Sequence, residues 1–434
     1  SRCRSRTSAR VFPMDVYVYE DSVVPTLGPL ITARPACDIT IGTIALYEML
    51  TQLGDVQRLL RPYLQHYVNS LGTDRIPHWG SVTTSKCSLQ KPVEGHVLFV
   101  NARLVPSRTN LSTLKELIDR KQSGRILAGE TLAAALIEQR NNEVLLETFV
   151  SGKDSSEGLV EEIKAPLIDS ELQLIQSPQD FLTAHENSID DMVALAIDSG
   201  QYIESRPGLF LKRKGYSDTS TVIDDFVSIR SGPVLIDEDV NVGPFCCLDG
   251  PLKICSGTRI HPHSWLGPAT VVGRDCRLAG EVTASVIESF SNKAHNGFLG
   301  HSHLGSWVNL GAGTITSNLK VSYGAIRLNL SRNEILQTDR QFFGTLCGDF
   351  SKTAIHTSLP CGALIGAAAT LAGRPTAFVP SLCSQLGNES PETTATVEQV
   401  VTALGRMMSR RGIQPHPADS DLIAAISELS KPDS

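Results

Sequence analysis

The sequence predicts two domains of different fold class: an α/β domain over residues 14–200 and an all-β parallel β-helix over residues 221–385. A helical tail follows over residues 391–434. Strand and helix patterns alternate in the first half, which is typical of α/β domains. Aliphatic residues then recur every six positions, and the tail returns to the three-to-four spacing of helices.

The first half begins with a β-branched and aromatic strand pattern, "DVYVYED" at 15–21, and a second strand is predicted in "GHVLFVNARLVP" at 95–106. Asp38 is placed to cap a helix that continues through residues 41–53. Residues 111–120, 129–141 and 178–200 are also predicted to be helices. We therefore expect a parallel sheet covered by helices.

The second half shows an aliphatic residue at every sixth position from Ile236 to Leu278, and the same phase returns at Leu359, Ile365 and Leu371. Neither a helix nor an ordinary strand has this period, whereas a three-sided parallel β-helix of hexapeptide repeats does. The phase breaks between Leu278 and Phe298 and again from about 316 to 350. We interpret both breaks as inserted loops or bulges, which on solenoids commonly carry a binding face.

Composition narrows the function classes. The net charge is −7 and the predicted pI about 5.9, so a global basic field for nucleic acid is absent. Ten cysteines without a CxxC pair indicate free thiols in a reducing compartment, and no apolar run is long enough for a membrane span. We expect a cytoplasmic protein that binds neither nucleic acid nor membrane.

The stretch "SNKAHNGFLGHSHLGSWVNLGAGT" (291–314) carries three histidines among glycines. Three interpretations remain open from the residues alone. The histidines could be surface decoration on turns. The pairs His301-x-His303 and His261-x-His263 could bind zinc, as in gamma-class carbonic anhydrases, if another subunit completes the ligand set. A histidine could instead act as the general base of an acyl transfer, with backbone N–H groups and asparagine amides stabilising the oxyanion.

The same stretch resembles the acetyltransferase domain of the bifunctional N-acetylglucosamine-1-phosphate uridyltransferase/glucosamine-1-phosphate acetyltransferase (GlmU) family. More closely it resembles a divergent GlmU-like set that shares "NKAHxGFLGHS", "VNLGAGT" and "GDxSK", here "GDFSK" at 348–352, and "RPACDITIG" at 34–42. The resemblance implies a nucleotidyltransferase-like α/β first domain, a left-handed β-helix and a homotrimer. It also implies acetyl-CoA-dependent N-acetylation of an amino-sugar-1-phosphate of the glucosamine-1-phosphate type, coupled to nucleotidyl transfer from UTP.

Site residues follow from that resemblance. His295 falls on the catalytic base. The expected acceptor contacts, including substitutes for a family lysine that falls near Thr283 here, are Asn309, Asn318, Phe298, Arg277, Lys293 and Lys320. Phe298 stands where the family has a tyrosine, so a hydroxyl contact is lost. The expected contacts to the acetyl carrier in a groove between subunits are Ala312, Ser351, Lys352 and Ala369.

The first half lacks the family's Gly-rich GxGTRM loop. Arg34 is the expected phosphate cation there, and Asn101 or Ala102 replaces the usual magnesium-binding aspartate. Asp38 is a candidate carboxylate for Mg²⁺, with the helix cap as its other role. A rival hypothesis therefore makes the protein a non-catalytic scaffold whose first half binds a nucleotide-sugar as a sensor.

Overall fold

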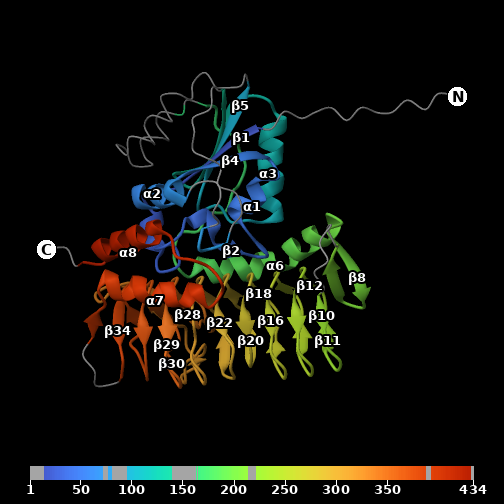
Figure 1. The fold of residues 1–434 in the computed structure, drawn as a ribbon. Coiled ribbons are helices and arrows are strands. Elements are labelled where there is room, and N and C mark those ends of the chain that lie inside the picture. The colour runs from blue at the N-terminus through green and yellow to red at the C-terminus, as the bar shows by residue number, and fades with distance from the viewer. Residues whose placement is uncertain are drawn as a thin grey trace.

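The computed structural model describes residues 14–71, 77–80, 95–138, 163, 165–213, 221–387 and 392–431. It shows an α/β domain seated on one side of a long β-helix, with the C-terminal helices packed against both (Figure 1). The two predicted fold classes are confirmed.

The α/β domain contains one five-stranded sheet in the order β4-β1-β5-β7-β6. Its strands are Gly54–Leu59, Met14–Tyr19, His96–Asn101, Thr131–Glu138 and Gly124–Ala128, in that order. The strand β1 pairs in parallel with β4 and β5, whereas β7 is antiparallel to β5 and β6. The sheet is mixed, and the expectation of a parallel sheet was wrong on its β7 side.

The antiparallel pairing arises from β7, which lies within the segment 129–141 that was predicted to be a helix. Its core, Leu132 to Ile137, is buried at every position, as in a strand covered on both faces. Burial therefore overrides the helix propensity of three consecutive alanines. The predicted helix over 41–53 is also wrong: residues 40–45 form a small hairpin of β2 (Thr40–Ile41) and β3 (Ile44–Ala45), and α1 is only Leu46–Leu50.

Helices cover the sheet and connect it to the β-helix. A short 3₁₀ turn, η1, spans Val24–Leu27, and α2 spans Pro62–Leu71. The predicted helices at 111–120 and 178–200 are confirmed as α3 (Arg108–Asp119), whose first turn is capped by the Ser107 side chain, and α6 (Asp180–Asp198). The helix α6 lies along the β-helix (Figure 1).

The β-helix has three parallel faces. Face 1 comprises Val222–Ile223 (β10), Asn241–Val242 (β13), Arg259–Ile260 (β16), Arg277–Leu278 (β19), Asn292–Lys293 (β22), Lys352–Thr353 (β29), Thr370–Leu371 (β32) and Cys383–Gln385 (β34), with Thr393–Thr394 (β35) antiparallel at its end. Face 2 comprises Ser228–Ser231 (β11), Cys247–Asp249 (β14), Trp265–Leu266 (β17), Glu281–Thr283 (β20), Phe298–Gly300 (β23), Ile315–Thr316 (β25) and Ser358–Leu359 (β30).

Face 3 lies beneath the α/β domain. Its strands are Tyr202–Arg206 (β8), Leu209–Lys212 (β9), Val234–Ile236 (β12), Leu252–Ile254 (β15), Thr270–Val272 (β18), Val286–Ile287 (β21), His303–Leu304 (β24), Thr345–Cys347 (β28), Ala363–Ile365 (β31) and Phe378–Val379 (β33). The strands β8 and β9 extend this face ahead of residue 221, because β9 pairs in parallel with β12.

All eight aliphatic residues of the six-residue series from Ile236 to Leu278 are at most 1% exposed and line the interior. The second phase break is an insertion, as predicted: the antiparallel hairpin of β26 (Arg327–Asn329) and β27 (Ile335–Gln337) separates β25 from β28. The first phase break was also predicted to be an insertion, and there the structure shows a shortened coil instead. The interior position moves from Leu278 to Val282 after only four residues, so this coil is shortened.

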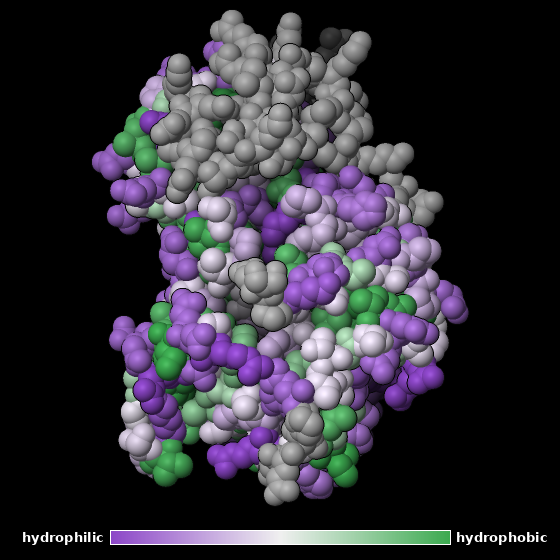
Figure 2. Space-filling model, turned by 90° about the vertical axis from the view of Figure 1, so that its left-hand side faces the viewer, coloured by the Kyte–Doolittle hydropathy of each residue, from purple (hydrophilic) through white to green (hydrophobic). Residues whose placement is uncertain are grey.

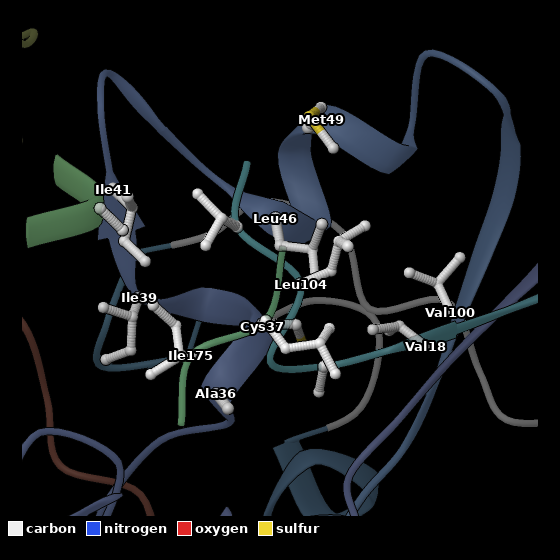
Figure 3. Close-up of a cluster of buried hydrophobic side chains, with 14 of the residues drawn as sticks. Val18, Ala36, Cys37, Ile39, Ile41, Leu46, Met49, Val100, Leu104 and Ile175 are labelled. Carbon is white, nitrogen blue, oxygen red and sulfur yellow. The ribbon is translucent and has the colours of Figure 1, made fainter. Parts of the chain in front are cut away.

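The core of the α/β domain continues into the β-helix. Figure 3 shows its central part around Val18, Cys37, Leu46 and Val100. The same hydrophobic cluster includes residues of the inserted hairpin and face 3, among them Leu328, Phe343, Leu346 and Leu364. The two halves therefore share apolar burial across their boundary.

Buried charges also cross this boundary, in a set that we call the interdomain joint: Arg34 and His78 from the α/β domain, with Glu288, His303 and Asp349 from the β-helix. All five residues are at most 5% exposed. Arg34 Nε donates to Asp349 Oδ2 at 3.1 Å, and His303 Nε2 lies 3.1 Å from Glu288 Oε1. Burial alone would raise the pKa of the Asp349 carboxyl, but Arg34 and His78 lower it to about 2.

The predicted tail is helical. The helices α7 (Val397–Ser409) and α8 (Pro417–Leu429) begin with capping boxes at Thr396 and His416. Their apolar faces pack with α2 and with Trp307 and Phe350 of the β-helix. From the end of the β-helix that carries its last coils, the surface mixes hydrophilic and apolar residues (Figure 2). No described helix is long and apolar enough to cross a membrane, and the cysteines of the described segments are free thiols.

Candidate functional site

His295 lies on the corner that joins face 1 to face 2, between β22 and β23, and its side chain is exposed. The same corner of successive coils forms one edge of the prism, which we call the His295 edge. A general base must reach solvent and an incoming amine, and His295 satisfies this requirement.

Lys293 holds the His295 corner from beneath. Its side chain occupies the interior position that Ile260 and Leu278 fill in the preceding coils of face 1, and the residue is only 2% exposed. Its Nζ donates to the carbonyl of Ala279 at 2.7 Å and to that of His295 at 2.9 Å. Burial lowers the pKa of this ammonium to about 8, against a raising effect of Glu281. Because Lys293 points inward, its predicted contact with an acceptor phosphate is wrong.

Gly297 fixes the same corner on its other side. Its φ of +133° is open to few L side chains, and a Cβ there would lie 2.2 Å from the Thr314 carbonyl oxygen. The Gly313 amide also donates to the carbonyl of Asn296 at 3.3 Å. The His295 corner is thus packed tightly against the next coil.

Phe298 and Asn318 come together around Gly300 on face 2, where a Cβ would contact both side chains. Asn318 Nδ2 lies 2.9 Å from His301 Nδ1, and the His301 ring stacks on Phe342 with centroids 5.2 Å apart. His301 lies on the corner between faces 2 and 3, so it marks a different edge from His295.

Asn309 lies on face 1, next to Asn292 on one side and Lys352 on the other, and is half-buried. Lys352 is also half-buried, its Nζ donates to the Phe350 carbonyl at 3.2 Å, and burial lowers its pKa. Lys320 Nζ donates to the Ala325 carbonyl at 2.6 Å within the insertion. The predicted acceptor contacts are therefore divided between face 1, face 2 and the insertion, and the His295 edge lies between the two faces.

Ala312 lies on the His295 edge, one coil after His295, and its carbonyl accepts from the amide of His356 at 2.8 Å. The side chains of two other predicted carrier contacts are buried. Ser351 is 1% exposed with its hydroxyl donating to the Gly366 carbonyl at 2.7 Å, and Ala369 is 0% exposed within the interior. Their side chains point into the prism.

The positions level with Ala312 on the His295 edge are instead Ala354 and Ile355, and then Ala372. Ile355 is 66% exposed, and Ala354 and Ala372 are not buried. No motif indicated these residues, because "GDFSK" ends on strand β29, before the corner. The six-residue repeat could have located them, since corner residues follow each interior residue.

The α/β domain places its predicted nucleotide contacts within its own packing. Arg34 is 0% exposed and pairs with Asp349 and Glu288 in the interdomain joint. Asn101 is also 0% exposed, donates to Asp21 at 2.7 Å and to the Leu132 carbonyl, and accepts from the Arg103 amide at 2.9 Å. Ala102 is buried as well. In this structure none of these side chains is open to a nucleotide.

Asp38 lies in a 3₁₀ turn (η2, Ala36–Asp38) and forms a bidentate pair with Arg58 at 2.8 and 2.9 Å, so neither the helix-cap nor the metal role fits it. Sequence reasoning missed two more carboxylates at the end of β1. Asp21 pairs with Arg103 at 2.6 Å, and Glu20 pairs with Arg61 at 2.8 Å. Since Mg²⁺ requires free oxygen ligands, these arginine-paired carboxylates do not fit a magnesium site.

The histidine pairs do not converge in one chain. His303 faces the interdomain joint while His301 lies at a corner, and His263 stacks on Phe245 with centroids 5.0 Å apart. Within the described segments, no group of three or more His, Cys, Asp or Glu side chains is placed to hold a metal ion.

The comparisons with known proteins fit this geometry. Residues 16–199 match the model of a sugar nucleotidyl transferase family. The chain is 31% identical over 151 residues to a bifunctional sugar-1-phosphate nucleotidylyltransferase/acetyltransferase of Sulfurisphaera tokodaii, covering 34% of this chain and 37% of that protein. It is 46% identical over 68 residues to the bifunctional protein GlmU of Rippkaea orientalis, covering 15% of each.

Among solved structures, a UDP-N-acetylglucosamine acyltransferase of Francisella novicida matches with a TM-score of 0.30 and 13% identity, over 52% of this chain and 74% of that one. The chain spans well under two thirds of the length of the two curated relatives named above. The chain is therefore similar to sugar nucleotidyl transferases over residues 16–199, and over part of its length to bifunctional nucleotidylyltransferase/acetyltransferases including GlmU proteins.

Proposed function

We propose that the β-helix transfers an acetyl group from acetyl-CoA to the amine of an amino-sugar-1-phosphate, with His295 as general base. The observation that carries this proposal is the His295 edge: an exposed imidazole on an anchored corner, followed along the same edge by Ala312, Ile355 and Ala372. Small and apolar side chains there suit the pantetheine arm of a carrier.

The chemistry follows from the position of the imidazole. His295 accepts a proton from the neutral acceptor amine as the amine nitrogen attacks the thioester carbonyl. The C–N bond forms, the C–S bond breaks, and the thiolate of coenzyme A leaves and is protonated. Amide and backbone N–H donors near the edge, including the Asn309 side chain, would stabilise the oxyanion.

Nucleotidyl transfer from UTP to the resulting sugar-1-phosphate is the second activity that we propose, and the family match over residues 16–199 supports it. Side chains other than Arg34, Asn101 and Asp38 would have to carry it. The alternative is that the first half serves only as a scaffold. Its buried arginines already pair with carboxylates of the protein, which favours this alternative.

A homotrimer in the cytoplasm completes the proposal. A narrow prism lacks a deep cleft of its own, and grooves between neighbouring prisms would enclose the carrier. The exposed aromatic residues Phe226 and Phe245, stacked 5.1 Å apart earlier on the His295 edge, are available for such a contact. Sedimentation at micromolar concentration tests the trimer, and a strictly monomeric protein would contradict it.

The test of the acetyl transfer is His295→Ala, with coenzyme A release from acetyl-CoA followed by chromatography in the presence of glucosamine-1-phosphate. We expect kcat to fall about 10²- to 10⁴-fold with an unchanged melting temperature. The exposed His66 of α2 provides the control, His66→Ala. Wild-type turnover by His295→Ala would exclude His295 as the base.

The two halves are separated by a second assay of the unaltered protein. Release of pyrophosphate from UTP with N-acetylglucosamine-1-phosphate and Mg²⁺ would establish the nucleotidyl transfer. Acetyl transfer without any pyrophosphate release would identify the first half as a scaffold. Zinc in stoichiometric amount by elemental analysis would revive the carbonic-anhydrase-like alternative.

A further inference from the structure

One coil beside His295 has a short corner. Four residues, His261 to Ser264, join β16 to β17, and four residues, Ala294 to Gly297, join β22 to β23. The intervening β19 and β20 are joined only by Ala279 and Gly280. The backbone is thus cut back at this coil of the His295 edge, and His261 and His295 lie on the two flanking corners.

Three arginines gather on face 1 next to this short corner, and we call them the arginine cluster: Arg259, Arg277 and Arg411. Arg259 and Arg277 are direct neighbours on adjacent strands, and Asn292 is the next residue in the same row. Adjacent strands lie about 4.8 Å apart, so the two guanidinium groups face the same side at short range.

Arg411 arrives from the C-terminal tail. It follows α7, which lies along the later coils of the β-helix (Figure 1). Its Nη2 donates to Asn292 Oδ1 at 2.7 Å, which brings it to the same row as Arg277. Each of the two arginines lowers the pKa of Arg277 after the effect of burial, with Arg411 the stronger, so the three charges are close enough to repel one another.

The cluster lacks the carboxylates that usually compensate such crowding. Within the described segments, none of the three guanidinium groups forms an ion pair, whereas seven arginines elsewhere in those segments do. Asp275 is the one carboxylate that acts on Arg277. His261, whose pKa is lowered by burial and then by His295, Arg277 and Arg259, connects the cluster electrostatically to His295.

Crowded guanidinium groups that form no ion pair suit a polyvalent anion, because Arg presents planar pairs of donors that match phosphate oxygens. We propose that Arg259, Arg277 and Arg411 bind a phosphoryl group of a substrate beside His295, so that the C-terminal tail completes the site. This inference rests on the proposed acetyl transfer. It extends the predicted role of Arg277 to two residues that no motif indicated.

Two substrates carry such a group, the amino-sugar phosphate and coenzyme A. The experiment compares Arg411→Gln with the wild type, measuring KM for glucosamine-1-phosphate and for acetyl-CoA separately, and binding of inorganic pyrophosphate by calorimetry. Arg406→Gln is the matched control, since Arg406 is exposed on α7 and has no ion pair in the described structure. Arg411→Lys tests whether charge alone suffices.

We expect Arg411→Gln to raise one KM about 10- to 100-fold, as for loss of one charge-assisted hydrogen bond, with kcat and melting temperature nearly unchanged. A rise confined to the sugar phosphate assigns the cluster to the acceptor, and a rise confined to acetyl-CoA assigns it to the carrier. Pyrophosphate affinity should fall with it and should weaken with salt.

Unchanged values of both KM and of pyrophosphate affinity in Arg411→Gln and in Arg277→Gln would overturn the inference. The calorimetric measurement does not depend on turnover. If the wild type shows no acetyl transfer but binds pyrophosphate, and Arg411→Gln does not bind it, the anion site is supported and the proposed function is refuted.

Discussion

Lys293 provides a prediction that depends on its burial in the prism. The substitution Lys293→Met keeps a long, flexible chain in the interior position but removes the charge. It also removes the two hydrogen bonds to the carbonyls of Ala279 and His295. The charge and the hydrogen bonds affect different observables, so one variant tests both.

The magnitude follows from the pKa of the ammonium, which burial lowers from 10.5 to about 8. This difference corresponds to about 3 kcal/mol of unfavourable free energy when the side chain is charged. The folded state releases the proton above about pH 8 and the unfolded chain above about pH 10.5. Wild-type stability contributed by this group is therefore lost as the pH falls through 8 and fully present above 10.5.

The assay measures the free energy of unfolding of both proteins by chemical denaturation between pH 7 and pH 10.5. The difference in the free energy of unfolding, wild type minus Lys293→Met, should increase by about 3 kcal/mol across this window. Taking the difference cancels the titration of every other group, because both proteins share it. A difference that stays constant with pH would refute the assignment of a buried, desolvated Lys293. At pH 7.5, kcat should also fall, because the His295 carbonyl loses its anchor, while KM changes little.

Three other substitutions test the fold around the site. Asp349→Asn should lower the free energy of unfolding by about 3–5 kcal/mol, because it leaves Arg34 buried without its partner. It should also remove the loss of stability that the wild type shows as the pH falls from 3.8 to 2, and denaturation at a series of pH values measures both effects. Ile260→Ala should cost about 2–5 kcal/mol, since it empties one layer of the prism, and a cost below about 1 kcal/mol would contradict its interior position. Gly297→Ala should lower both melting temperature and kcat, because its Cβ would strike the Thr314 carbonyl, and wild-type values would contradict the tight corner.

The sequence predicted the β-helix well because one interior side chain per face is a periodic signal. It predicted the insertion near 316–350 for the same reason. It misassigned the first phase break, since a loss of period looks the same for an inserted and a deleted residue. The deletion at Ala279–Gly280 became visible only when the strand pairs Ile260–Leu278 and Leu278–Lys293 fixed the register.

The candidate site was predicted unevenly for a related physical reason. His295 is a corner residue two positions before Gly297, and the sequence shows such positions as breaks in the apolar pattern. Whether Lys293, Ser351 or Ala369 points inward depends on register, which a lysine or serine does not reveal. Arg34 and Asp349 lie 315 positions apart, and only the docking of the two halves brings them into contact.

The shared core and the interdomain joint carry a consequence for how the gene can change. Separating the two halves would expose apolar surface to water and leave buried charges without their partners on both halves. A lineage that no longer needed one of the two proposed reactions could not simply lose the corresponding domain. The lineage would have to keep that domain, because the other domain depends on it for stability. An inactive domain could therefore be retained for its structural role alone.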